Sequence, residues 1–401
     1  MVAPPYDPQV KAYPPPRRVV VTGIGVVSPA GIGLDAFWKG LREEPALRRV
    51  RHIEDFDAGP WLSSKEQRHH DRFTHFAIAA AAMAVDHAGG LPDVDLTRAG
   101  VSLGTGIGGI STFEVQVGVL AERGPGRVSP FTIPMVMPNA GAASVSLAYG
   151  WRGPCETLTT ACAAGTHSVA AGARMIFDGR CDVAFAGGAE ASINGVTVAA
   201  FSKMTALSDT GLSRPFDLGR DGFCLSEGAA VLLLEEREAA LARGATIYGE
   251  IAGTASTCDA HHITAPSPGG VGAAHCMRLA LEDAGLHPAD IRHVNAHGTS
   301  TPLNDQAEAQ AVTTVFGAGA VPVTSIKGVT GHGLGAAGAL EAAAVLMSFH
   351  HRELPPTMGT TQVDPSLEVD VVLEPRTWEP GPTVSNSFGF GGHNGSLVLL
   401  P

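Results

Sequence analysis

Long apolar runs, rather than alternating ones, mark the strands that the sequence predicts. RRVVVTGIGVV at residues 17–27 and VLLLE at residues 231–235 contain few polar positions, which is typical of strands in sheets that are buried on both faces. Alanine- and glycine-rich segments of helical character, such as residues 169–176, alternate with such runs. This alternation predicts an α/β protein built of packed layers.

The order of these elements repeats along the chain, which indicates two related halves. AVDHAGG followed by AGVSLGTG resembles LALEDAG followed by IRHVNAHGT, displaced by about 195 residues. A second pair, TTACAAGTHSVAAGA and SIKGVTGHGLGAAGA, is displaced by only about 166 residues. The first half is therefore expected to carry an insertion near residues 111–149, where prolines and methionines interrupt any regular pattern. Such a segment could cover a pocket or a partner subunit.

These repeats divide the chain into a proline-rich lead-in at residues 1–16, a first half at 17–245 and a second half at 246–401. The lead-in lacks the apolar core of a signal peptide, and no apolar run is long enough to span a bilayer. We therefore expect no membrane span.

Composition narrows the functional classes further. The net charge is -12 and the one short basic run lies at residues 48–51, so nucleic acid is not expected as a partner. The six cysteines form neither a CxxC pair nor a Cys/His cluster with metal-ligand spacing. This pattern predicts reduced thiols, no metal site and a cytoplasmic location.

Cys162 is the first candidate for chemistry. It lies in TTACAAGTHS, between an apolar, β-branched run at 156–160 and an alanine-rich helical run, an order typical of a strand, a sharp turn and a buried helix. The dipole and the unpaired N–H groups at a helix N-terminus favour a thiolate. The alternative is a small cysteine that only packs. The repeat unit in the second half carries His332. Because both helices lack a polar face, we expect them at the centre of the protein, with Cys162 and His332 at their N-terminal ends.

Further polar segments follow predicted strands: NAHGTSTPLND with His297, SIKGVTGHGLGAAG with Lys327, and NSFGFGGHN with Phe388 and Phe390. A lone histidine in apolar surroundings is more often a core residue than a catalytic one. If the halves pack about a pseudo-twofold axis, however, these turns converge on Cys162. One thiol and two imidazoles would then share a pocket.

TTACAAGTHS, RPFDLGRDGF followed by SEGA, NAHGTSTPLND, KGVTGHGLGAAG and NSFGFGGHN, in this order, resemble the motifs of β-ketoacyl-acyl carrier protein synthases of the elongating type I/II group. The resemblance extends from about Arg17 to the C-terminus. It implies the thiolase fold, in which two pseudo-twofold-related βαβαβαββ halves form five α-β-α-β-α layers.

The residues present also separate classes within this superfamily. Thiolases need a second cysteine near the C-terminus, and no cysteine follows Cys276. Initiating synthases resemble Cys-His-Asn, whereas His332 resembles the second histidine of the Cys-His-His elongating class. Chain-length-factor partners lack the active cysteine that Cys162 supplies.

The resemblance implies a decarboxylating Claisen condensation. An acyl chain held on Cys162 would react with malonyl-acyl carrier protein to give 3-oxoacyl-acyl carrier protein, CO2 and free carrier protein. His297 and His332 would bind the enolate oxygen, Lys327 would order the pocket, and the backbone N–H groups of Cys162 and Phe388 would form the oxyanion hole. No cofactor is implied beyond the phosphopantetheine arm of the carrier protein.

The resemblance assigns further residues. Supporting roles go to Glu341 and Asp305. The expected substrate contacts are Thr299, Thr301, Phe388, Phe390, Ile107, Phe201, His262 and Thr264. An acidic carrier protein needs a local positive patch, for which the candidates are Lys65, Arg68, Arg127 and Lys203. The chain departs from the family at His393, where threonine is more usual, and at Gly333, where a bulkier residue is common.

Three questions stay open at this point. The pathway could be fatty-acid or polyketide elongation, and the assembly could be a homodimer or a heterodimer with a chain-length-factor homologue. A ketosynthase subunit of a type II polyketide synthase is one alternative function. A non-catalytic scaffolding partner is another, against which Cys162 argues.

Overall fold

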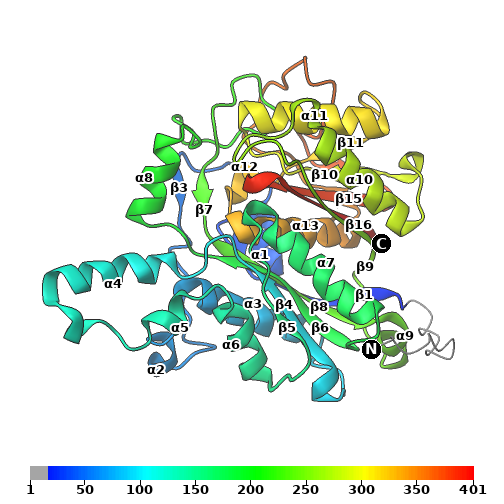
Figure 1. Ribbon diagram of the computed structural model, residues 1–401. Helices are drawn as coiled ribbons and strands as arrows, with labels where there is room; N and C mark the ends of the chain where they lie inside the picture. Colours follow the sequence, from blue (N-terminus) through cyan, green and yellow to red (C-terminus); the bar gives the residue numbers. More distant parts are fainter. Residues whose placement is uncertain (1–16) are drawn as a thin grey trace, which may run out of the picture.

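The structure is a computed structural model that describes residues 17–401 (Figure 1). The expected lead-in at residues 1–16 lies outside the described residues. Ten strands build the two halves of the large sheet. They are β1 (Val19–Ser28), β4 (Ala99–Gly104), β5 (Cys155–Glu156), β6 (Val183–Glu190) and β8 (Gly228–Glu236) in the first half, and β9 (Gly249–Cys258), β10 (His293–Asn295), β11 (Pro322–Thr324), β15 (Thr383–Gly389) and β16 (His393–Leu400) in the second.

Both halves have the same strand order. It is β5-β4-β6-β8-β1 in the first half and β11-β10-β15-β16-β9 in the second. In each half the first three of these strands are parallel and the remaining pairs are antiparallel. The first strands of the two halves, β1 and β9, pair with each other and join everything into one twelve-stranded sheet, in which β2 (Gly31–Ile32) and β13 (Asp370–Val371) are short additions. The internal repeat is therefore a repeat of topology.

Two apolar helices occupy the centre of the molecule, between the strands of the two halves. Residues of α7 (Ala164–Phe177) and α13 (Ala337–His351) share one buried cluster with β1, β6, β8, β9 and β16. Every residue from Ala337 to Phe349 is buried. Small residues allow the two helices to touch, because a Cβ on Gly338 would lie 2.0 Å from the hydroxyl of Thr166. The prediction that helices without a polar face lie at the centre is confirmed.

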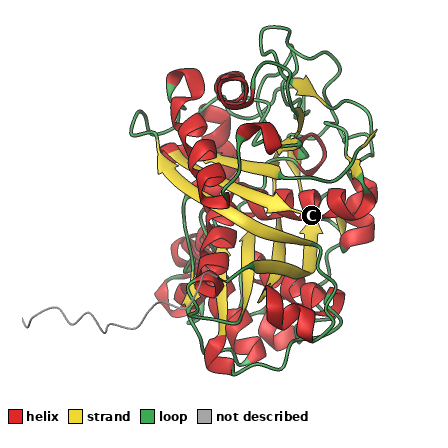
Figure 2. Cartoon of the chain, turned by 90° about the vertical axis from the view of Figure 1, so that its right-hand side faces the viewer, coloured by secondary structure: helices red, strands yellow, loops and turns green. Residues whose placement is uncertain are grey.

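Other helices cover the outer faces (Figure 1, Figure 2). In the first half, α3 (Arg72–His87) and α6 (Ala140–Tyr149) pack on β4, β6 and β8. In the second half, α10 (Val271–Ala284) and α11 (Pro302–Phe316) form the corresponding cluster with β10, β11, β15 and β16. Burial on both faces explains why the strands read as continuous apolar runs, since all ten residues of β1 are buried.

Apart from α4, which has 14 residues, the remaining elements are short. The helices are α1 (Leu34–Gly40), α2 (Ser64–Gln67), α4 (Ile110–Arg123), α5 (Thr132–Val136), α8 (Gly195–Lys203), α9 (Arg237–Ala242) and α12 (Lys327–Thr330). Two small sheets pair β3 (Val50–Arg51) with β7 (Leu225–Ser226), and β12 (Glu353–Leu354) with β14 (Arg376–Thr377). Single 3₁₀ turns are η1 (Leu96–Arg98), η2 (Pro125–Arg127), η3 (Ala161–Ala163), η4 (Pro268–Gly270), η5 (Pro288–Asp290), η6 (Leu334–Ala336) and η7 (Phe390–Gly392).

Three expectations about local structure were wrong. The strand before Cys162 ends at Glu156, so residues 157–160 are not the β-branched strand that was expected. Residues 111–149 contain most of α4 and all of α5 and α6, although their prolines suggested no regular structure. The strands before the two repeated turns have the expected offset, 322 − 155 = 167 residues, but the 3₁₀ turns themselves are 334 − 161 = 173 residues apart rather than about 166, because the connection before η6 is longer and contains α12. Between residues 17 and 401, no helix is long and apolar enough to cross a bilayer.

Candidate active site

Cys162 lies where η3 leads into α7. The preceding Ala161 has φ 51°, a left-handed conformation that bends the chain sharply and brings the thiol to the end of the helix. The side chain is 6% exposed and contributes to the wall of a cavity of about 410 Å³. Leu207, Phe223, Leu225 and Leu334 surround it as a small apolar cluster. The thiol is therefore shielded from solvent except on the side that faces the cavity.

His332 lies beside the thiol, with its Nε2 3.1 Å from Cys162 Sγ. It precedes η6 and α13 in the second half, as η3 and Cys162 precede α7 in the first. Its main chain is fixed by the β7 region, since its N–H donates to Cys224 O at 2.8 Å and its carbonyl accepts from Ser226 N at 3.0 Å. The turns that carry Cys162 and His332 therefore meet, although 170 residues separate the two side chains in the sequence.

His297 supplies a second imidazole, which follows β10. Its ring centroid is 5.4 Å from that of His332, and the planes are nearly perpendicular at 83°. Both rings line the cavity. The backbone N–H of His297 donates to Glu308 Oε1 at 2.8 Å, and that of Gly298 donates to the other oxygen, Oε2, at 2.7 Å. This clamp holds the turn that carries the imidazole.

Lys327 orients His297 from behind. Its ammonium is 1% exposed, donates to Glu341, and lies 2.5 Å from the carbonyl oxygen of His297 and 3.3 Å from its Nδ1. An ammonium has no lone pair, so it can only donate to Nδ1. The proton of the neutral ring is therefore on Nε2.

Burial and neighbouring charge set the protonation states. Burial, reinforced by Lys327, lowers the pKa of both His297 and His332 well below the usual histidine value, so both rings are neutral at physiological pH. Burial raises the pKa of Cys162 to about 12, although Lys327 and nearby backbone N–H groups oppose the shift. The expectation of a ready thiolate was therefore wrong: desolvation outweighs the helix end, and the resting group is a thiol.

The loop after β15 places an N–H group beside the sulfur. The N–H that faces Cys162 from the loop after β15 belongs to Phe390 and not to Phe388, the second oxyanion donor that the family resemblance implied. Gly389 approaches closely, because a Cβ there would lie 3.1 Å from the nitrogen of Cys162. A buried thiol, two neutral imidazoles and converging N–H groups can together carry an acyl group and stabilise an oxyanion.

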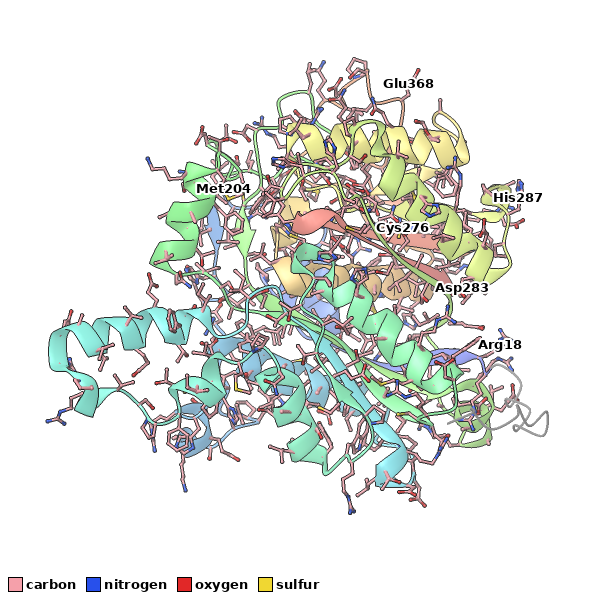
Figure 3. All side chains as sticks on the ribbon, in the orientation of Figure 1. Arg18, Met204, Cys276, Asp283, His287 and Glu368 are labelled. Carbon is pink, nitrogen blue, oxygen red and sulfur yellow. The ribbon has the colours of Figure 1, made fainter. Side chains whose placement is uncertain are left out.

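The cavity brings together most of the expected substrate contacts. Thr264, Thr299, Thr301, Phe201, Phe388, Phe390 and Met204 line it. Figure 3 labels Met204 beside α8. Thr299 and Thr301 share a hydrogen bond of 2.9 Å. Asp305 lies behind them and accepts the N–H of Ser300, and Glu341 lies behind Lys327.

Two expected contacts lie elsewhere. Ile107 is 36% exposed and is not part of the cavity wall. His262 is exposed, and its Nδ1 accepts the N–H groups of Thr264 and Ala265, so it stabilises its own loop. Cys276, in α10, is buried outside the cavity (Figure 3). Cys162 is thus the single thiol that lines it.

Two buried carboxylates at the site were missed by sequence reasoning. Glu308 lies among alanines on α11, and nothing in its spacing distinguishes it from a solvated helix residue. Glu190 ends β6 and has no exposed surface. A carboxylate at the end of the apolar run VAFAGGAE was a usable signal, because an acid there needs donors that only tertiary contacts supply.

The four docking candidates are all exposed. Lys65 belongs to α2, Arg68 follows it, Arg127 lies in η2, and Lys203 ends α8. None of the four forms an ion pair within residues 17–401. In the same range no cluster of histidine, cysteine and acidic residues has the geometry of a metal site.

The fold and sequence are similar to those of known condensing enzymes. The family models described as β-ketoacyl synthase, N-terminal domain and C-terminal domain match residues 44–240 and 248–361. The chain is 42% identical to a 3-oxoacyl-[acyl-carrier-protein] synthase 2 of Synechocystis sp., over 96% of this chain and 98% of the relative. An enzyme of the same name from Staphylococcus aureus is 40% identical over 96% and 98%.

Solved structures agree. The ishigamide ketosynthase/chain length factor matches with a TM-score of 0.90 and 34% identity over 96% of this chain and 99% of that one. A β-ketoacyl synthase from Burkholderia phymatum matches with a TM-score of 0.87 and 34% identity, also over 96% and 99%. A chain from the structure of a type II polyketide synthase acyl-carrier protein in complex with its ketosynthase matches with a TM-score of 0.87 and 30% identity, over 96% of this chain and 99% of that one.

Proposed function

This chain belongs to the β-ketoacyl synthase family, and from that premise we propose that it elongates acyl chains by decarboxylating Claisen condensation on Cys162. It is a 3-oxoacyl-[acyl-carrier-protein] synthase, an acyltransferase. The observation that carries the residue assignment is the contact of 3.1 Å between His332 Nε2 and Cys162 Sγ, with a second neutral imidazole in the same cavity.

In the first half-reaction the Cys162 sulfur attacks the acyl thioester. The S–C bond to Cys162 forms, the bond to the carrier thiol breaks, and the thiol proton passes to the departing sulfur. Because the pKa of Cys162 is about 12, the proton must leave as the bond forms. His332 Nε2, 3.1 Å from the sulfur, can donate its N–H to the negative charge that develops there. Exchange of one thioester for another is nearly isoenergetic and keeps the acyl carbonyl electrophilic.

In the second half-reaction the malonyl thioester loses CO2 and becomes an enolate. His297 and His332 donate to its oxygen, and as neutral rings they offer hydrogen bonds without protonating the carbon nucleophile. The enolate carbon attacks the acyl carbonyl, whose oxyanion accepts the N–H groups of Cys162 and Phe390. The Cys162 sulfur then leaves and takes up one proton, which completes the balance.

The partner assignments are part of the proposal. The acyl and malonyl groups arrive on acyl carrier protein, which would dock at the exposed Lys65, Arg68, Arg127 and Lys203. Large apolar side chains are exposed along α4 to α6, among them Val115 at 61%, Ile133 at 67% and Leu147 at 81%, and a group of exposed apolar side chains is typical of an interaction surface. We assign this surface to a second subunit, in a homodimer or in a heterodimer, and the protein to the cytoplasm.

The finer architecture belongs to the same proposal. We assign residues 17–245 and 246–401 to the two halves of a thiolase fold in five α-β-α-β-α layers. Their equal strand order and the central pair α7 and α13 support this assignment.

A second candidate is a type II polyketide ketosynthase subunit that works with a chain-length-factor homologue. The likeness to the ishigamide ketosynthase/chain length factor favours it. Condensation by the chain purified alone, as a homodimer in native mass spectrometry, would support the fatty-acid assignment; activity only on co-expression with a homologue would support the second.

Two variants distinguish the role of Cys162 in acyl transfer from that of His297 in condensation. Cys162→Ala should accumulate no acyl-enzyme and no 3-oxoacyl product. His297→Ala should still acquire one acyl group by intact mass and fail to condense it. Product from the first variant, or native condensation by the second, would overturn these assignments.

A further inference from the structure

The second half of the protein contains a copy of the turn that carries Cys162, and this copy has no nucleophile. The turns η3 and η6 each begin at a residue with positive φ, 51° at Ala161 and 45° at Leu334, and each leads into a central helix. Neither residue is glycine, so both turns hold strained backbone. In this alignment Cys162 corresponds to Gly335, three residues after His332.

A carboxylate occupies the position in front of this second turn. The N–H of Gly335 donates to Glu190 Oε2 at 3.1 Å, and the N–H of Gly106 donates to the same oxygen at 2.5 Å. Two backbone N–H groups that converge on one anionic oxygen are the arrangement that stabilises an oxyanion in acyl transfer. Here a protein side chain fills that place, and the Ser192 hydroxyl donates to its other oxygen, Oε1.

This contact joins the two halves. Glu190 ends β6 and Gly106 follows β4 in the first half, whereas Gly335 belongs to the second. The approach leaves no free space, since a Cβ on Gly335 would lie 2.2 Å from the nitrogen of Gly106, and one on Gly188 would lie 2.4 Å from the carbonyl oxygen of Gly335. The turn after His332 is therefore seated against the first half around the Glu190 carboxylate.

Among the described residues, the imidazole of His332 is hydrogen-bonded on one side only, through its Nε2 to Cys162. Its Nδ1 is buried and has no hydrogen-bond partner among residues 17–401. Phe223 packs edge-on against the ring, with centroids 4.9 Å apart, but no side chain in the described part of the chain hydrogen-bonds its Nδ1 as Lys327 does that of His297. The main chain of the turn is held from both sides, through Cys224 and Ser226 at His332 itself and through Glu190 at Gly335.

We propose that Glu190 is a positioning residue that holds the turn after His332, and through it the His332 imidazole, against Cys162. The proposal rests on the function assigned above to Cys162 and His332. It also gives a role to the second turn, which has no nucleophile. The N–H group of Gly335 in this turn binds the Glu190 carboxylate and so holds the second half of the protein against the first.

The geometry distinguishes two replacements of Glu190. Both backbone N–H groups use Oε2, so the single oxygen of a glutamine can accept both, while its amide nitrogen faces the Ser192 hydroxyl, which can accept. Glu190→Gln therefore keeps the seat, and Glu190→Ala removes it. Ser192→Ala serves as a control that alters only the Oε1 side.

The experiment compares these variants in the purified full chain with acyl and malonyl carrier protein. Met175→Ala is the stability control, because Met175 is buried in α7 away from the cavity. We expect Glu190→Ala to lower the kcat of condensation at least roughly tenfold, with its KM for malonyl carrier protein within about twofold and with complete end-point acylation of Cys162. Glu190→Gln and Ser192→Ala should stay within about threefold of the native kcat.

Three results would overturn the proposal: native kcat in Glu190→Ala, equal losses in Glu190→Gln and Glu190→Ala, or the same kcat loss in Met175→Ala at an equal fall in melting temperature. Failure of the underlying function is a different outcome, since the native protein would then form no 3-oxoacyl product at all.

Discussion

Replacing Lys327 with methionine tests whether the buried ammonium sets the working form of His297. The change removes the donors to Glu341, to the carbonyl oxygen of His297 and to its Nδ1, while methionine keeps much of the apolar stem. The ring would then be free to carry its proton on Nδ1 and lose its donor toward the cavity. The expected defect is in condensation rather than in acylation.

The structure sets the size of both effects. Glu341 is 1% exposed, and removing one partner of a buried ion pair costs roughly 3–5 kcal/mol. Burial already raises the pKa of Glu341 to about 7 against the opposing charge of Lys327. Without the ammonium the carboxyl group takes up a proton, which keeps the loss near the lower end. Loss of a preorganised donor to an oxyanion lowers kcat roughly 10²–10³-fold.

The assay compares native protein, Lys327→Met and the double variant Lys327→Met/Glu341→Leu. Urea unfolding should show that the double variant recovers part of the stability lost in the single one, because it buries no unpaired carboxyl group. Intact mass should show complete acylation of Cys162 in all three. The condensation rate should stay at least about 100-fold below native in both variants.

Restored condensation in the double variant would refute the reasoning, because Lys327 would then serve only to neutralise Glu341. Native condensation in Lys327→Met would refute it as well.

Two further predictions concern titration. Burial raises the pKa of Glu308 from 4.5 to about 8, so the folded protein keeps a proton that the unfolded chain releases, and this contribution to stability falls as pH rises through that range. Glu308→Gln should therefore lose less stability than native protein between pH 5 and pH 8, by up to about 3.5 kcal/mol in urea unfolding; parallel curves would contradict this. Because the thiol of Cys162 has a pKa of about 12, its alkylation by iodoacetamide should rise about tenfold per unit up to about pH 10. A plateau near pH 8.5, the ordinary thiol range, would show that the sulfur is not desolvated.

Much of the fold followed from local pattern. Strands that are covered on both faces are apolar at nearly every position, and helices without a polar face lie in the interior. The hydrophobic pattern of β1, α7 and α13 was therefore enough to predict that these elements are buried. The repeat was visible because each half has the same strand order. The offset of its turns was misjudged, since loop length before η6 leaves no periodic signal.

Cys162, His297 and His332 were candidates because each lies in a turn of small residues next to a buried element, whereas Lys327, which begins α12, was assigned its role from the family resemblance. Ile107 and His262 were placed by resemblance, and their exposure depends on how the loops around them pack.

By itself the sequence determined the mixed α/β class, the repeated order of elements and the turn of small residues around Cys162, because period, side-chain size and turn chemistry are local properties. Only the tertiary structure decided which groups are charged and which atoms meet. Desolvation depends on everything that surrounds a group in space, and it turns the Cys162 thiolate expected from a helix end into a thiol with a pKa of about 12. The contact of Glu190 with Gly335 likewise joins positions 145 residues apart, and only the packing of one half on the other creates it.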